Sequence, residues 1–248
     1  MRRAAVAPVQ RELTLCRTFV QLADTLTPDF ALESFLDALT QSCVRVLEVT
    51  GAGIVLAAHD DEPGRSAGST PYLRELAELE LRLSDGPTFD SYRLGVPVGW
   101  NASDDGQNGR WPKFVAAARS GGYLAAHALP MQHGESRIGA INLFVQESVG
   151  IDQHTVELGQ AMADVATVAI LHRRMIRQQE VLAEQLQAAL DSRIVIEQAK
   201  GILGERLGIS VTEAFGLLRG HARRNRRKLS MVAEGVIAGT VDIPHQPR

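Results

Sequence analysis

Residues 123–145 read YLAAHALPMQHGESRIGAINLFV, and this stretch decides the fold class of the first half of the chain. Two apolar, strand-like runs, Tyr123–Met131 and Ile138–Val145, are separated by the turn-forming residues QHGES. This arrangement predicts two neighbouring antiparallel strands joined by a short turn. We therefore expect an antiparallel sheet as the centre of the N-terminal half.

Helical and strand-like patterns alternate before this stretch. Helical periodicity marks residues 11–27, 31–49, 72–83 and 111–120, and short strand-like runs mark residues 53–59 and 96–100. In the second helix the apolar stripe consists of Leu32, Phe35, Leu36, Leu39, Cys43, Val46 and Leu47. Strands mixed with flanking helices predict an α+β domain over residues 11–150.

Helical periodicity continues with little interruption from Asp152 to Leu207. Apolar residues recur along it at every seventh position, as one core position of a coiled coil requires: Val168, Met175, Leu182, Ala189 and Ile196. The second core position is only half apolar, because it reads Leu171, Gln178 and Gln185. We expect residues 151–185 to form a helical linker that dimerises, and a solvated single helix is the alternative.

Three helices are predicted within residues 186–241, the first being the end of the long helix. Gly208 ends that helix, and Ser210 and Glu213 have the S-x-x-E spacing of a capping box. A third helix is expected over Met231–Ala238, with Ser230 as its N-cap. The positions expected to face inward are Ile194, Ala199, Ile202 and Leu203 in the first helix and Ala214, Leu217, Leu218 and Ala222 in the second.

Positive charge gathers at the C-terminal end. The whole chain has a net charge of −3, yet from Asp191 onward ten Lys and Arg residues stand against six Asp and Glu residues. This asymmetry favours a polyanion as a partner of the C-terminal bundle. The candidate RNA-binding residues lie on or beside one face of it: Arg193, Lys200, Arg219, Arg223, Arg224, Arg226, Arg227 and Lys228.

Motifs of several common enzyme classes are missing. The chain contains no GxGxxG or GxxxxGK[ST] motif, and its histidines form no HExxH pattern. We therefore expect no catalysis, no cofactor and no metal. The two cysteines, Cys16 and Cys43, lack a CxxC spacing and are expected to be reduced thiols. Without a secretory signal or an apolar run of about 20 residues, a cytoplasmic protein with no membrane partner is expected.

Two segments, SRIVIEQAKGIL (192–203) and ERLGISVTEAFGLLRGHARRNRRKLSMVAEGVI (205–237), carry a family resemblance. Together they resemble an ANTAR domain, the RNA-binding module of bacterial transcription antiterminators, over roughly residues 185–240. The resemblance implies a homodimer that binds hairpins with short loops in the nascent transcript, so that a downstream terminator cannot form. Phe215, the only Phe, Tyr or Trp in this region, is expected in the core, which leaves recognition to arginine planes and phosphate contacts.

The N-terminal half, from Leu13 to Val145, resembles a GAF domain of the kind that precedes ANTAR modules in actinobacteria. The resemblance rests on SDGPTFDSYRLGVPV (84–98), RWPKFVAAARSGGYLAAHALPM (110–131) and RIGAINLF (137–144). Relatives often read GPC where this chain has Thr88 after Gly86 and Pro87, so a thiol-based sensor is not supported. The Thr88 hydroxyl is expected to cap the following helix. The domain is expected either to be a sealed structural domain that mediates dimer contact or to contain a pocket for an unidentified small molecule.

We therefore interpret the chain as an RNA-binding antitermination regulator, possessing a GAF-like sheet domain, a long linker helix and a three-helix bundle. The alternative is a non-catalytic signalling or protein-interaction module whose basic bundle docks on an acidic partner. A DNA-binding helix-turn-helix is less consistent with the sequence, since the basic run Arg223–Lys228 replaces the short glycine-containing turn of such motifs.

Overall fold

The computed structural model describes residues 17, 18, 20, 31–58, 63–103, 109–147 and 150–244. These residues fall into two compact units, Met1–Arg174 and Met175–Arg248. The helix expected over residues 11–27 lies outside the described residues except at three positions, which are helical.

A five-stranded antiparallel sheet forms the centre of the first unit, with strand order β2-β1-β5-β4-β3. The strands are β1 (Gly51–Leu56), β2 (Arg65–Gly68), β3 (Val98–Asn101), β4 (Ala125–His133) and β5 (Ser136–Val145). The expected hairpin is confirmed as β4 and β5, which pair Leu129 with Ile141. Strand β2 was not expected, because this four-residue edge strand, RSAG, has no apolar alternation.

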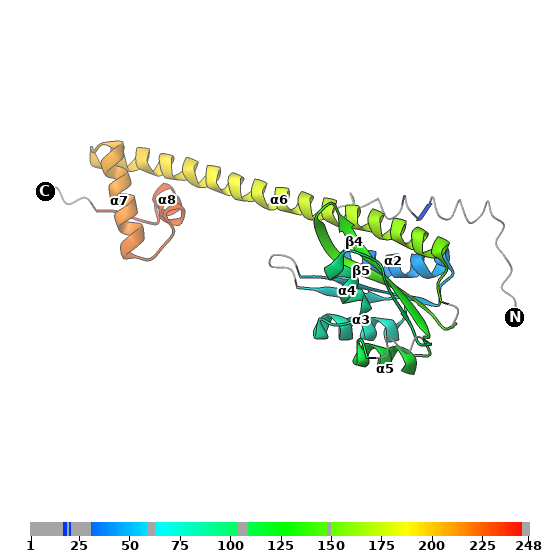
Figure 1. Ribbon diagram of the computed structural model, residues 1–248. Coiled ribbons are helices and arrows are strands. Elements are labelled where there is room, and N and C mark those ends of the chain that lie inside the picture. Colours follow the sequence, from blue (N-terminus) through cyan, green and yellow to red (C-terminus); the bar gives the residue numbers. More distant parts are fainter. Residues whose placement is uncertain are drawn as a thin grey trace. The chain divides into compact units, whose positions relative to one another are not determined.

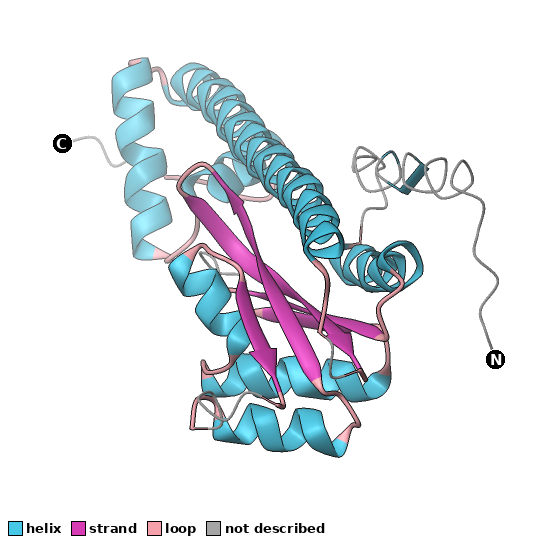
Figure 2. Ribbon diagram, turned by 45° about the vertical axis from the view of Figure 1, so that its right-hand side comes forward, coloured by secondary structure: helices cyan, strands magenta, loops and turns pink. Residues whose placement is uncertain are grey.

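One face of the sheet packs against α2 (Leu32–Leu47) and the first part of α6 (Gln153–Leu207). The inward stripe expected for α2 is confirmed at five positions, Leu36, Leu39, Cys43, Val46 and Leu47, all of which are buried. Met162, Ala166 and Ile170 of α6 complete this core. The helices on either side of the sheet can be followed in Figures 1 and 2.

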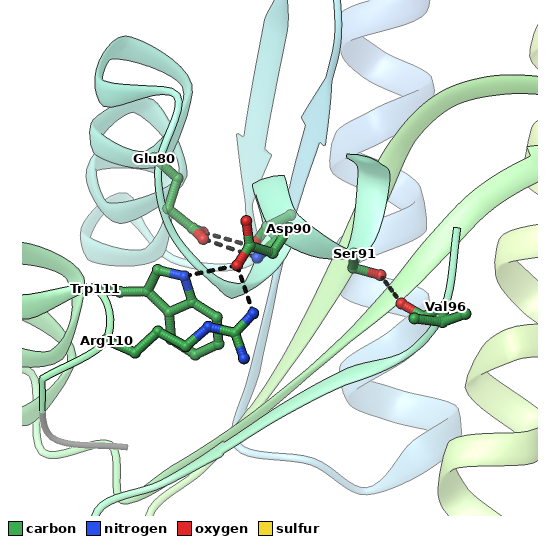
Figure 3. Close-up of polar contacts among 7 residues, drawn as sticks. Glu80, Asp90, Ser91, Val96, Arg110 and Trp111 are labelled. Atoms are coloured by element: carbon green, nitrogen blue, oxygen red, sulfur yellow. Dashed lines mark hydrogen bonds and ion pairs between the residues drawn. The ribbon is translucent and has the colours of Figure 1, made fainter. Parts of the chain in front are cut away.

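The opposite face of the sheet is covered by α3 (Pro71–Leu83), α4 (Pro87–Leu94) and α5 (Pro112–Ser120). Aromatic side chains fill this second core, where the Trp100 ring lies edge-on to Phe114 with centroids 5.7 Å apart. Asp90 of α4 accepts hydrogen bonds from the Trp111 indole at 3.1 Å and from the Arg110 guanidinium at 2.8 Å (Figure 3). These bonds tie α4 to the start of α5.

The second unit contains the end of α6 together with α7 (Val211–Arg224) and α8 (Leu229–Ile237). Its core is formed by Ala199, Leu203, Ala214, Leu218, Ala222, Val232, Ala233, Val236 and Ile243. The α+β class, with a long helix and a helical bundle after the sheet domain, is thus confirmed. In the part of the chain that the structure describes, no helix is long and apolar enough to cross a membrane.

Two expectations about the bundle are wrong. Ile194 is 56% exposed rather than inward, because it precedes Ala199 by five residues and so lies on the opposite side of the helix. Val195 and Ile196 pack against the core instead. Helix α8 begins at Leu229, with Lys228 as an N-cap that makes no side-chain hydrogen bond, so Ser230 lies inside the first turn.

Candidate nucleic-acid interface

The start of α7 is fixed by local hydrogen bonds. Gly208 adopts a left-handed φ of 65° just after α6 ends, and the chain then enters the capping box. The Glu213 backbone N–H donates to Ser210 Oγ at 3.2 Å, and the Ser210 N–H donates to Glu213 Oε2 at 2.9 Å. This confirms the expected box. It sets where α7 begins, and therefore which of its residues face α6.

Lys200 of α6 is held rather than free. Its ammonium donates to both oxygens of Glu197, at 2.8 and 2.9 Å. The Lys200 side chain is only 15% exposed, whereas that of Glu197 is 55% exposed. The ammonium also lies 5.6 Å from the centre of the Phe215 ring on α7, within the range of a cation–π interaction. Lys200 therefore joins the two helices at the surface of the bundle.

Phe215 is half-buried and does not belong to the bundle core, contrary to the expectation that it packs inside. The neighbouring positions Ala214 and Leu218 take the inward places. Phe215 follows Ala214 by one residue, which turns it about 100° away from the core direction. The ring consequently lies at the side of the bundle, next to Lys200.

The other candidate cations are exposed. Arg219 is one helical turn after Phe215, so it lies on the side of α7 that Lys200 contacts. Arg193 is two turns before Lys200 on α6 and is exposed as well. Arg223 and Arg224 end α7, and Arg226, Arg227 and Lys228 are exposed in the turn before α8. The structure thus brings Lys200 together with Phe215 and places Arg193 and Arg219 on the same side.

The part of α6 that lies in the second unit exposes a series of apolar side chains. Met175, Leu182, Leu186, Leu190 and Ile194 are each 49–59% exposed. Leu186, which the seven-residue spacing had not singled out, follows Leu182 by four residues. Two residues of the expected seam are engaged elsewhere, since Leu171 packs on the sheet core and Ile196 on the bundle core.

The first unit contains a buried polar cluster. Glu80 of α3 is 1% exposed and accepts hydrogen bonds from the Thr88 N–H at 2.9 Å and the Thr88 hydroxyl at 2.6 Å. The Asn142 amide of β5 donates to the Thr88 hydroxyl oxygen at 3.0 Å. Burial raises the pKa of Glu80 to about 8, while the bonds from Thr88 work in the opposite direction. Figure 3 shows Glu80 pointing from α3 toward α4.

The role expected for Thr88 is therefore wrong. The N-cap of α4 is Gly86, which has no side chain to donate or accept, and Thr88 is already inside the first turn. Its hydroxyl bonds Glu80 and Asn142 instead of a backbone group of α4. The helix start is capped from outside, because the Glu80 carboxyl group accepts a hydrogen bond from the Thr88 N–H, which has no partner within α4.

Among the described residues, no group of three or more His, Cys, Asp or Glu side chains is arranged to hold a metal ion. Cys43 is a free, buried thiol, and burial raises its pKa to about 12, so the thiol stays protonated. Cys16 lies outside the described residues.

Comparison with known protein families identifies a domain within the second unit. The family profile of the ANTAR domain matches residues 184–237. Residues 184–237 form an ANTAR domain. ANTAR domains are RNA-binding modules of transcription antitermination regulators, and the residues described above, from Arg193 to Lys228, all lie within the match.

Comparison with solved structures gives the fold of the first unit. The chain is similar to the GAF domain of an Acinetobacter phosphoenolpyruvate-protein phosphotransferase, with a TM-score of 0.50 and 12% identity over 69% of this chain and 98% of that one. It is also similar to a phycoerythrobilin-bound GAF domain from a cyanobacterial phytochrome, with a TM-score of 0.47 and 15% identity over 70% and 100%.

A third similar structure is the free methionine-R-sulfoxide reductase of Neisseria meningitidis, with a TM-score of 0.47 and 12% identity over 71% and 98%. No curated protein sequence matches the chain. The first of these likenesses shows a GAF fold in front of the ANTAR domain. At such identities the likeness extends to the fold and not to a ligand or an activity.

Proposed function

We propose that this protein is a non-catalytic regulator of transcription that binds hairpin RNA in nascent transcripts through its ANTAR domain and prevents a terminator from forming. The observation that carries the proposal is the basic face within the ANTAR match, where Arg193, Lys200 and Arg219 share one side of the bundle. Nascent transcripts are made in the cytoplasm of bacteria, and the proposed function places the protein there.

The proposed RNA contacts divide into two groups. Arg193, Lys200 and Arg219 project from helices, so their positions are set by the packing of α6 and α7. Arg223, Arg224, Arg226, Arg227 and Lys228 extend the positive surface through the end of α7 and the following turn. Exposed guanidinium groups bind phosphates with paired hydrogen bonds. Phosphate contacts from residues on helices would fix the position and orientation of the bundle on the hairpin.

We also propose that the protein acts as a homodimer joined through α6. Met175, Leu182, Leu186 and Ala189 follow one another at spacings of seven, four and three residues, which is the spacing of coiled-coil core positions. Their exposure in the single chain leaves an apolar stripe whose best complement is the same stripe of a second copy. In this proposal the linker, residues 151–185, includes part of the contact between the two copies. It follows a sheet domain over residues 11–150 and precedes a bundle over residues 186–241.

We propose that the GAF-fold domain modulates RNA binding by taking up a small molecule on the α3–α4–α5 side of its sheet. Two buried polar atoms on that side, Asn142 Oδ1 and Trp100 Nε1, have no hydrogen-bond partner. Buried polar atoms are normally paired, so these two are the groups with which a ligand would be recognised. A ligand that raises the thermal midpoint of the wild type but not of Asn142→Ala would support this site.

Gel shifts test the RNA proposal against its alternatives. The full chain is mixed with a pool of hairpin RNAs that share one stem and carry randomised short loops, with duplex DNA, and with an acidic peptide. Binding to hairpins is expected to be lost in Lys200→Ala and in Arg219→Ala while the helical circular dichroism is retained. Arg177→Ala removes the same charge from an exposed position of α6 outside this face and is expected to bind like the wild type.

Unchanged hairpin binding in both face variants would contradict the assignment of this face. Preference for the acidic peptide or for duplex DNA would replace the RNA proposal with a protein-interaction or a DNA-binding function. Cross-linking in cells followed by sequencing of the bound RNA would then name the transcripts.

A further inference from the structure

The position of Phe215 bears on how RNA is read. It is the only Phe, Tyr or Trp residue after Phe144, and it is half-buried at the side of the bundle rather than in its core. An apolar ring that contributes little to the core and lies beside proposed RNA contacts is available to contact a ligand. Aromatic rings at protein surfaces provide stacking planes for unpaired bases.

Lys200 gives this ring a fixed cationic neighbour. The ammonium lies 5.6 Å from the ring centre and is held by both oxygens of Glu197. A lysine that reached freely into solvent would be largely exposed, whereas the Lys200 side chain is only 15% exposed. An ammonium carries three N–H donors, and since two point to Glu197, one remains for an RNA acceptor. The ring and the ammonium therefore form one preorganised unit.

The helix surface beside Phe215 is open. Gly216, next to Phe215, is exposed, and a Cβ added there would meet no atom within 4 Å. Arg219, one turn further along α7, is exposed and can contact the phosphate that follows a stacked base. Lys200 of α6 and Arg219 of α7 thus supply cations near Phe215 from two helices.

We propose that Phe215 and Lys200 form a stacking platform for one unpaired base of the bound hairpin loop. This inference rests on the proposed RNA-binding function and gives it a specific contact. It also replaces the expectation of recognition without aromatic stacking. The paired stem would be held by the arginines through its phosphates, and the loop would be read at Phe215.

The test compares Phe215→Leu with Phe215→Tyr in the full chain. Leucine keeps an apolar side chain under Lys200 but offers no ring, and tyrosine keeps the ring. The probes are the hairpin pool with randomised short loops and the same stem closed by an abasic linker. The wild type is expected to prefer loops that contain bases. Phe215→Leu is expected to lose roughly tenfold to a hundredfold in affinity for them, with little change for the abasic hairpin. Phe215→Tyr is expected to keep the preference.

Retention of the preference for base-containing loops in Phe215→Leu would overturn the platform while leaving RNA binding intact. Failure of the wild type to bind any hairpin would instead overturn the proposed function. Ultraviolet cross-linking of the wild-type complex, followed by peptide mass spectrometry, gives a second measurement that needs no variant. A loop nucleotide joined to Phe215 is expected, and cross-links confined to other peptides would contradict the inference.

Discussion

The hydroxyl of Thr88 donates a 2.6 Å hydrogen bond to the buried carboxyl group of Glu80, eight residues earlier in the chain. This bond and the one from the Thr88 N–H join the end of α3 to the start of α4. Gly86 leaves the space for it, because a Cβ there would lie 2.2 Å from Glu80 Oε1. The interior of the GAF-fold domain thus contains an ionisable group that accepts two hydrogen bonds from Thr88.

Glu80 makes stability depend on pH. Since burial raises its pKa from 4.5 to about 8 in the folded state, the folded chain binds more protons than the unfolded chain between these values. The free energy of unfolding is therefore expected to fall as pH rises through this window, by at most about 1.4 kcal/mol per pH unit. Glu80→Gln is expected to flatten this part of a urea-denaturation profile, and an unchanged slope would show that Glu80 does not titrate in this way.

Thr88 is expected to contribute stability through its hydroxyl group. Thr88→Val keeps the shape of the side chain but removes the donor to Glu80 and the acceptor for Asn142. The cost is expected to be about 1–3 kcal/mol, because buried polar groups lose their partners. Thr88→Ser keeps the hydroxyl and serves as the matched control. Equal stability of Thr88→Val and the wild type in urea denaturation would rule out a stabilising role of these bonds.

The salt dependence of RNA binding is expected to report the number of phosphate contacts. With five to eight cations on phosphates, the logarithm of the association constant should fall with the logarithm of salt concentration at a slope of about −4 to −6. Arg219→Ala, measured where binding is still detectable at low salt, is expected to make the slope less steep by about one. A slope near zero would mean that phosphates contribute little.

Dimerisation is expected to depend on Leu182. Leu182→Asp places an unpaired carboxylate in the proposed seam, which costs more than about 1.4 kcal/mol and should raise the dimer dissociation constant at least roughly tenfold. Val181→Asp is the matched control, because Val181 is also exposed but lies about 100° around the helix. Sedimentation analysis in which both variants dissociate equally, or neither does, would argue against this seam.

The segment after α8 is expected to stabilise the bundle. Ile243 is 1% exposed and belongs to the bundle core, although it lies six residues beyond the end of the ANTAR match. Ile243→Ala is expected to lower the free energy of unfolding by about 2–5 kcal/mol, as for other large core truncations. Asp242→Ala, at the exposed neighbouring position, should leave the denaturation curve nearly unchanged. Two superimposable curves would place Ile243 outside the core in solution.

The amino-acid sequence by itself determined the features that depend on residues close together in the chain. The Ser210–Glu213 capping box, the stop at Gly208 and the β4–β5 hairpin could be predicted because their hydrogen bonds join near neighbours. The ANTAR resemblance could also be recognised from the sequence, because its residues lie close together in the chain, on three consecutive helices. Periodicity also predicted the buried face of α2.

Tertiary structure alone decided the contacts between distant elements. Glu80 looks like an ordinary charged residue of an amphipathic helix, and only the packing of α3 against α4 and β5 buries it beside Thr88 and Asn142. Phe215 looks like a core residue beside Leu217 and Leu218, but α7 packs with Ala214 and Leu218 inward and leaves Phe215 next to Lys200 of α6. Spacing along one helix specifies a face, whereas the residue that a face meets is set by how separate elements pack.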